Sequence, residues 1–165
     1  MIQLNFFREK EKINPTACVF TGHRHLDADF SLKKLKKHIE AVIKDGVTEF
    51  YNGMALGFDL IAAQTVLSLK KKYPSVKLIA CIPCKDQDKY FSIEDKRLYH
   101  ELLEKADERI LISENYHKGC MLQRNRYMVD KSDIMIAYCN KPTGGTAYTV
   151  KYFQKIHPDS KILFI

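Results

Sequence analysis

The chain has 165 residues, and its 27 lysine and arginine side chains against 20 aspartate and glutamate side chains give a formal net charge of +7. This length fits one domain. A hydrophobic content of 45% is too high for an intrinsically disordered chain. The apolar runs are far shorter than the roughly 18 residues that a membrane span needs. The sequence therefore predicts one globular domain, residues 1–165, with no transmembrane helix and no membrane partner.

The first 14 residues are expected to be an N-terminal extension of this domain. They contain a charged run from Arg8 to Lys12 and lack the apolar core and cleavage site of a signal peptide. The five cysteines are an odd number without the spacing of a disulfide framework. Both observations favour a cytoplasmic protein.

Strand-like and helix-like segments alternate along the rest of the chain. Six short runs rich in β-branched and aromatic residues are typical of buried parallel strands: 16–21, 49–52, 76–82, 109–113, 133–138 and 161–165. Helical periodicity separates them, over 32–44, 58–73, 92–106, 119–131 and 147–155. Ser31 and Ser92 are the expected N-caps of two of these helices, and Pro74 ends another.

This alternation predicts an α/β fold: a single Rossmann-like domain, with a mostly parallel sheet of about six strands and helices on both faces. We expect the strand order 3-2-1-4-5, in which the third and fourth strands lie on opposite sides of the first. Ligands of such sheets bind beyond the carboxyl ends of the strands, so the loops that follow the strands are the candidate sites.

Glycines gather in three of these loops. Five of the seven glycines follow the first, second and fifth strands: Gly22, Gly53, Gly57, Gly144 and Gly145. Glycine permits positive φ and a close approach of the backbone to a ligand, and the N-terminus of the next helix attracts an anion. Any one of these glycines alone is equally compatible with a simple tight turn. The convergence of three loops at one rim of the sheet favours an anion site.

Arginines lie near the same loops, although the chain is otherwise lysine-rich. Arg24, Arg124 and Arg126 are three of only six arginines, and a guanidinium suits bidentate binding of a phosphate or carboxylate. Arg126 lies four residues before Asp130 on a predicted helix, so we expect it to form a structural ion pair. Arg124 is the better ligand candidate.

The motifs together resemble those of the YpsA family, from about residue 16 to the C-terminus. They are VFTGHR at 19–24, NGMALGFDLIAAQ at 52–64, CIPC followed by Gln87, QRNRYMVDKSD at 123–133 and GGTAYTV at 144–150. This family belongs to the SLOG superfamily of Rossmann-like domains, named after the DNA-processing protein DprA and the LOG phosphoribohydrolases. The resemblance implies a nucleotide-derived ligand, such as NAD or ADP-ribose, at the glycine-rich rim. It brings no established enzymatic activity with it.

The LOG enzymes also indicate what this chain lacks. Arg124 matches their substrate-contacting arginine, with Asn125 beside it, and Gly144, Gly145 and Thr146 match part of their glycine-rich signature. The glutamate that supports N-glycosidic cleavage is missing, because residues 147–154 contain no acidic side chain. The resemblance therefore implies binding without hydrolysis.

The predicted site has no assigned catalytic residue and no metal. The expected ligand-binding residues are Thr21, Gly22, His23, Arg24, Asn52, Gly53, Gly57, Asp59, Gln87, Arg124, Asn125, Gly144, Gly145 and Thr146. A hydrogen-bonding role is favoured for His23 over that of a general base. Asp59 can accept hydrogen bonds from ribose hydroxyls, or it can lie in the first turn of its helix only because the helix dipole stabilises a carboxylate there. Gln87 is equally open to a binding or a structural role.

Two other features suggest different chemistry. Cys81 and Cys84 have the C-x-x-C spacing of redox and zinc sites, and His117 with Cys120 is the only tempting second ligand pair. The expected strand order places these pairs far apart, so we disfavour this interpretation. The lysine run from Lys33 to Lys37 is more typical of a solvated helix face than of a nucleic-acid surface.

The sequence thus favours a nucleotide-binding sensor or regulator that requires no cofactor. One alternative is a hydrolase that uses Asp59 as its carboxylate. Another is a DprA-like binder of single-stranded nucleic acid with Tyr90, Phe91 or Tyr148 as stacking residues, although a nucleic-acid partner is disfavoured. A homodimer and an unidentified protein partner are left open.

Overall fold

The computed structural model describes residues 15–165, and the predicted extension at 1–14 lies outside them. Six strands and five helices alternate as expected. The elements are β1 Ala17–Gly22, α1 Leu32–Lys44, β2 Glu49–Asn52, α2 Phe58–Leu69, β3 Lys77–Ile82, α3 Ile93–Lys105, β4 Glu108–Leu111, α4 Cys120–Asp130, β5 Ile134–Tyr138, α5 Gly145–Ile156 and β6 Ile162–Phe164. The α/β, Rossmann-like prediction is confirmed.

The order of the strands differs from the prediction. All five pairings in the sheet are parallel, and the order is β4-β3-β2-β1-β5-β6. The fourth strand therefore lies beside the third, so the expected separation of these two strands is wrong. From β1 to β4, each new strand is added on the same side of the one before it, and β5 is then added on the other side of β1. The direction of strand addition therefore reverses between β1 and β5.

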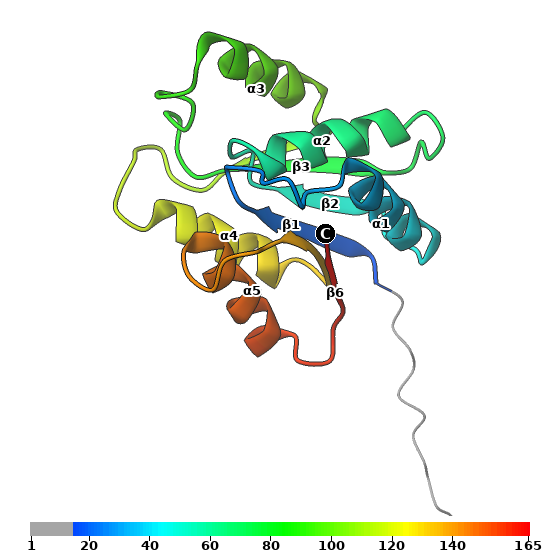
Figure 1. Cartoon of the computed structure of the whole chain (residues 1–165). Helices are drawn as coiled ribbons and strands as arrows, with labels where there is room; N and C mark the ends of the chain where they lie inside the picture. The colour runs from blue at the N-terminus through cyan, green and yellow to red at the C-terminus, as the bar shows by residue number, and fades with distance from the viewer. Residues whose placement is uncertain (1–14) are drawn as a thin grey trace, which may run out of the picture.

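The helices cover both faces of the sheet. Helices α1 and α2 lie over one face with α3 beyond α2, and α4 and α5 lie over the other (Figure 1). Side chains of β1 alternate accordingly: Cys18 and Phe20 join the core under α1 and α2, whereas Ala17 and Val19 join the core under α4 and α5. Because both faces are covered, this strand is apolar at consecutive positions.

The helix ends follow local chemistry. Oγ of Ser31 accepts the backbone N–H of Lys34 at 3.1 Å, and Oγ of Ser92 accepts that of Asp95 at 3.1 Å, so both predicted N-caps are present. Helix α2 ends at Leu69, before the predicted end at 73, and α5 begins at Gly145, earlier than predicted. Within residues 15–165, no helix has the length and apolarity to cross a bilayer.

The loops after β1 and β2 are in direct contact at Gly57. This residue has φ of +79° and ψ of −117° and precedes α2. The N–H of Phe58 donates to the carbonyl of His23 at 3.2 Å, and a Cβ at Gly57 would lie 2.0 Å from the carbonyl oxygen of Arg24. Only glycine allows this approach of the two backbones.

Replacing this glycine tests the contact between the loops. We expect Gly57→Ala to lower the free energy of unfolding by about 3 kcal/mol, since backbone strain and a backbone clash add. Gly119→Ala is the matched control: Gly119 also has positive φ, +88°, but nothing lies within 4 Å of an added Cβ. The control should lose only about 1 kcal/mol. Urea unfolding measures both, and equal losses would contradict a close contact at Gly57.

Candidate functional site

The loop after β2 is held in a strained conformation. Met54 is fully buried and has φ of +57°, an unusual value for a residue with a side chain. Oδ1 of Asn52 accepts the N–H of Met54 at 2.8 Å, and its Nδ2 donates to the carbonyl of Asp59 at 2.8 Å. The buried Asn52 amide therefore fixes the path of the loop on both sides. Such strain persists where surrounding contacts enforce it, often at binding sites.

The carbonyl of Gly53 is the point where two buried side chains meet. Nη1 of Arg124, from α4, donates to it, and Nε2 of Gln87 donates to it at 2.8 Å. Nη1 of Arg124 also donates to the carbonyl of Cys81, at the end of β3, at 3.2 Å. The remaining amide oxygen of Gln87 accepts from the hydroxyl of Tyr99 at 3.1 Å. Both ends of the Gln87 amide are thus engaged within the protein, and its predicted contact with a ligand stays a prediction.

The Asp59 carboxylate lies in the first turn of α2 and is only 6% exposed. Its Oδ2 accepts the N–H of Ala55 at 3.3 Å. Its Oδ1 is buried and has no hydrogen-bond partner among the described residues. Burial raises the pKa of this carboxyl to about 6, although the charges of Arg124 and Arg24 and the Ala55 N–H act in the opposite direction.

The charge of the Arg124 guanidinium acts on this carboxylate, but the two groups form no ion pair within residues 15–165. Arg124 is 4% exposed, and burial lowers its pKa while the charge of Asp59 raises it. Hydrogen bonds from Arg124 to described residues use Nη1 and Nε, which leaves Nη2 available. Two opposite buried charges therefore retain polar atoms that a ligand can satisfy.

Arg24 adds a second positive charge on the exposed side. Its Nη2 lies 3.3 Å from the sulfur of Met121, which places the guanidinium near the start of α4. Its charge lowers the pKa of both Asp59 and Arg124. The charges of Arg24, Asp59 and Arg124 therefore influence one another, and their membership of one binding site stays a prediction.

The glycine-rich loop after β5 is open. Gly144 precedes α5 with φ of +98°, and nothing lies within 4 Å of a Cβ added at Gly144 or Gly145. Thr149, one turn into α5, is buried, and its hydroxyl donates to the carbonyl of Gly145 at 2.8 Å. Nδ2 of Asn125 donates to the same hydroxyl at 3.0 Å, and Oδ1 of Asn125 accepts from Nε of Arg124 at 2.8 Å. Hydrogen bonds thus connect this loop to the arginine.

The first loop contributes a histidine that is already bonded. The backbone N–H of Asn140 donates to Nε2 of His23 at 3.0 Å. Burial and the charge of Lys141 lower the pKa of His23, against the effect of Asp27 and Asp29. The lone pair of Nε2 is therefore already occupied, which supports hydrogen bonding over general-base catalysis. Thr21 is buried at the end of β1, and Gly22 packs against Phe58, where a Cβ would lie 2.3 Å from the ring.

Arg126 does not form the predicted ion pair with Asp130. Its guanidinium donates to the hydroxyl of Tyr148 and lies 5.5 Å from the centre of that ring. Asp130 instead accepts from the hydroxyl of Tyr152 at 2.8 Å. The aromatic residues of α5 outcompete the neighbour on the same helix because α4 and α5 pack side by side.

The cysteine pairs are nearer to each other than predicted. Since β3 and β4 are neighbours, Lys85 pairs with Glu114 across the two loops that follow these strands, and Cys120 is close enough to Cys84 to add to the effect of burial in raising the pKa of the Cys84 thiol. The expected separation of these loops is therefore wrong. Within residues 15–165, no three side chains form a metal-binding group. Burial raises the pKa of Cys81 to about 12, so this thiol is not activated.

Four residues that contact the predicted site were not among its predicted members, although three of them lie within the motifs at 52–64 and 144–150. Met54, Ala55, Tyr99 and Thr149 all contact predicted site residues through the hydrogen bonds described above. Thr149 lies four residues after Gly145, the spacing at which a hydroxyl reaches a helix carbonyl. That spacing was the one available signal, whereas the positive φ of Met54 has none.

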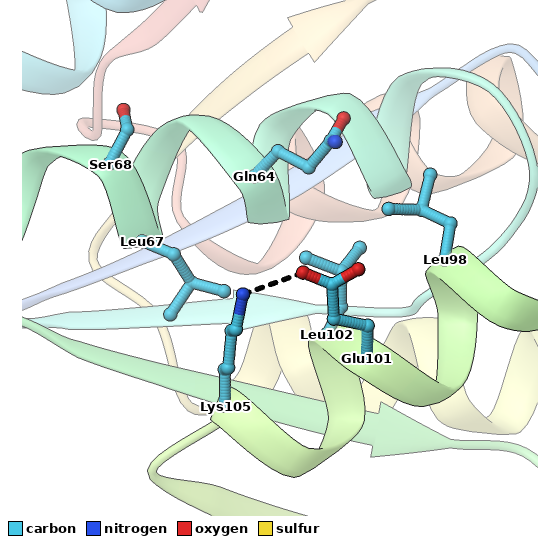
Figure 2. Close-up of a pocket in the computed structure, with 7 residues that line it drawn as sticks. All are labelled: Gln64, Leu67, Ser68, Leu98, Glu101, Leu102 and Lys105. Atoms are coloured by element: carbon cyan, nitrogen blue, oxygen red, sulfur yellow. Dashed lines mark hydrogen bonds and ion pairs between the residues drawn. The ribbon is translucent and has the colours of Figure 1, made fainter.

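A separate surface groove lies between α2 and α3. Leu67, Leu98 and Leu102 line it, and Lys105 donates to Glu101 across the α3 surface at 2.6 Å (Figure 2). None of the predicted binding residues lines this groove. It is therefore distinct from the glycine-rich rim.

Comparison with protein families and curated sequences finds relatives over most of the chain. The YpsA family model, described as the YspA SLOG family, matches residues 18–164. The SPbeta prophage-derived protein YoqJ of Bacillus subtilis (strain 168) is 33% identical over 155 residues, covering 78% of this chain and 91% of YoqJ. A UPF0398 protein of Halalkalibacterium halodurans is 29% identical over 137 residues, covering 81% of this chain and 72% of that protein.

Two solved structures share the fold. DNA processing protein A (DprA) of Helicobacter pylori superposes with a TM-score of 0.66 at 21% identity and covers 92% of this chain. DprA of Streptococcus pneumoniae gives a TM-score of 0.65 at 20% identity and covers 91% of this chain. The matched region spans 65% and 50% of those two chains, so each DprA extends well beyond it.

The buried Asp59 carboxylate, which has no ion-pair partner within residues 15–165, predicts an unusual pH dependence of stability. Its folded pKa of about 6 lies above the ordinary value of 3.8, so ionisation costs free energy in the folded state only. The cost is absent below pH 4, grows as the pH rises to 6 and is complete above that. We expect Asp59→Asn to stabilise the protein by about 3 kcal/mol at pH 7.5, at roughly 1.4 kcal/mol per pKa unit.

Chemical denaturation between pH 4 and 8 measures this difference. Asp107→Asn is the opposite control, because partial burial raises the pKa of Asp107 but its contacts with Lys70 and the N–H of Leu78 outweigh this effect and lower the pKa below its ordinary value. That control should lose stability above pH 4. A destabilised Asp59→Asn at pH 7.5 would show that the carboxylate has a favourable partner.

Proposed function

The chain belongs to the YpsA family of SLOG proteins, as its motifs predict, and from this premise we propose that it binds a nucleotide or nucleotide sugar at the rim formed by the loops after β1, β2 and β5. NAD and ADP-ribose are the leading candidates. The observation that carries the proposal is the buried Oδ1 of Asp59, which has no partner within residues 15–165, together with the nearby charge of Arg124, whose Nη2 makes no hydrogen bond to those residues.

The chemistry of the rim suits the two ends of such a ligand. A carboxylate with an unused oxygen accepts hydroxyl donors, and a ribose presents two adjacent hydroxyls. A guanidinium binds phosphate in a bidentate manner. The open Gly144–Gly145 backbone at the start of α5 supplies N–H groups and the positive end of a helix dipole. A phosphorylated ribose satisfies all three.

The same residues favour a sensor or regulator over an enzyme. Cleavage of an N-glycosidic bond needs a carboxylate beside a cationic sugar, and α5 carries no acidic residue in its sequence GTAYTVKYFQKI. Nε2 of His23 is occupied by the Asn140 N–H and is a poor general base. We therefore propose a cytoplasmic protein whose nucleotide-bound state is read by a partner.

A thermal-shift screen over NAD, ADP-ribose, AMP and cyclic nucleotides tests this proposal, because a ligand that binds only the folded state raises the melting temperature. Asp59→Asn should abolish the shift even though the variant itself melts higher than the parent. Arg124→Lys should weaken binding at least tenfold, because a lysine lacks the planar fork. Binding by Asp59→Asn with parent affinity would exclude Asp59 from the site.

Single-stranded DNA is a second candidate ligand. The H. pylori DprA structure is described by its single-stranded DNA binding mode. In this chain, Tyr90 and Tyr116 are exposed at the rim beyond β3 and β4, and the ammonium of Lys89 lies 5.4 Å from the centre of the Tyr90 ring. Exposed aromatics beside lysines can stack bases and contact phosphates.

The dependence of binding on salt distinguishes the two ligands. Oligonucleotide binding through several lysines releases counterions, so its affinity falls steeply with salt, whereas a mononucleotide in a formed cleft has a shallow dependence. We expect binding of a short oligothymidylate to be lost by about 150 mM salt while the nucleotide shift persists. Tyr90→Ala should affect only the former. Tight oligonucleotide binding at that salt concentration would favour the DNA-binding function.

A further inference from the structure

We propose that Asn125 and Thr149 are positioning residues that fix the Arg124 guanidinium and couple it to the first turn of α5. The inference rests on the proposed function, since it assigns roles within the same rim. Thr149 carries no ligand role in the predictions from sequence, and Asn125 is predicted there only as a direct contact.

The contacts form one continuous chain between the two halves of the rim. Nε of Arg124 donates to Oδ1 of Asn125 at 2.8 Å, and Nδ2 of Asn125 donates to Oγ1 of Thr149 at 3.0 Å. The Thr149 hydroxyl then donates to the carbonyl of Gly145 at 2.8 Å. At its other end, Arg124 donates through Nη1 to the carbonyl of Gly53.

The direction of every hydrogen bond in this chain is forced. A guanidinium can only donate, so the Asn125 oxygen must face it and the amide nitrogen must face Thr149. The Thr149 oxygen then accepts, and its single proton is left for the Gly145 carbonyl. No member can reverse its role while the others keep theirs, so the orientation of Arg124 depends on the hydroxyl of Thr149.

This dependence joins the two polar ends of a ligand. Gly145 is the first residue of α5, in the open loop proposed to receive a phosphate, and the charge of Arg124 acts on the carboxylate proposed to receive a ribose. A shift of the Gly145 carbonyl changes the bond that holds Thr149, and through Asn125 it changes the placement of Arg124. The rim therefore favours a ligand that contacts both sides together over one that contacts a single side.

Thr65 provides a matched comparison within the same molecule. Its hydroxyl donates to the carbonyl of Ile61, four residues earlier on α2, at 2.7 Å, and its side chain is buried like that of Thr149. No hydrogen bond from a described side chain reaches the Thr65 hydroxyl. The Thr65 hydroxyl thus only donates a hydrogen bond to its own helix, whereas the Thr149 hydroxyl also accepts one from Asn125.

The test compares Thr149→Val, Thr149→Ser and Thr65→Val with the parent. Calorimetry with ADP-ribose measures affinity, and nitrogen-edited NMR of the ligand-free protein measures solvent exchange of the Arg124 Nε–H, assigned with Arg124→Lys. We expect Thr149→Val to bind ADP-ribose about tenfold more weakly, which is the change in affinity expected when one or two buried hydrogen bonds are lost. The Nε–H of Arg124 should also lose its protection from solvent exchange in this variant. Thr149→Ser should restore both, and Thr65→Val should change neither.

The two measurements separate this inference from the proposed function. If the parent does not bind ADP-ribose, the proposed ligand is wrong, and the Nε–H exchange alone decides the positioning role. If Thr149→Val keeps both the affinity and the protection of the parent, the inference is overturned. It is also overturned if Thr149→Ser fails to rescue the Nε–H signal or if Thr65→Val reproduces the loss. Thr149→Ala replaces Thr149→Val if the latter does not fold.

Discussion

The site depends on the bond between the buried Arg124 guanidinium and the Gly53 carbonyl. A buried cation needs acceptors on several sides, and Arg124 obtains them from the loop after β2, from the end of β3 and from Asn125 on its own helix. The same bond explains the glycine, because a Cβ at position 53 would lie 2.7 Å from the guanidinium carbon. The first requirement for Gly53 is thus the approach of Arg124, ahead of the approach of a ligand.

Near this bond, the protein contains a backbone conformation and a buried charge that each lower the stability of the folded state. Met54 is held at positive φ inside the core, and Asp59 is buried with an oxygen that no described residue satisfies. Each costs on the order of 1–3 kcal/mol, which is a large share of the stability of a small domain. Both costs fall in the segment that directly follows Gly53, whose carbonyl Arg124 binds, and such local costs are expected at functional sites, which supports the ligand site proposed above.

The sequence predicted the strands and helices and named Gly53, Gln87 and Arg124, which hydrogen bonds join, but it did not predict how the strands are ordered. Periodicity and caps located the helices to within a few residues, since Ser31 and Ser92 act locally. The position of β4 depends on which side of β3 the chain turns to, and no local pattern encodes that choice. The Arg126 partner was missed for a similar reason: the spacing to Asp130 was visible, whereas the packing of α4 against Tyr148 was not. The bonds of Thr149 and Tyr99 likewise join residues far apart in the chain.

The strand order explains why α4 supplies the central arginine. Strand β4 lies at one edge of the sheet, and β5 lies on the other side of β1, so the chain must return across the sheet between them. Helix α4 makes this return, and it packs against β3 on the way. It is thereby able to reach the end of β3 and the loop after β2 from a single position. Because of this reversal, the loop after β1 leads to α1 on one face of the sheet, whereas the loop after β5 leads to α5 on the opposite face (Figure 1). These two loops diverge at neighbouring strands, which is the place where open α/β sheets form their ligand crevices. Arg124 thus reaches the carbonyls of Gly53 and Cys81 because the chain reverses one strand later than the expected order 3-2-1-4-5 requires.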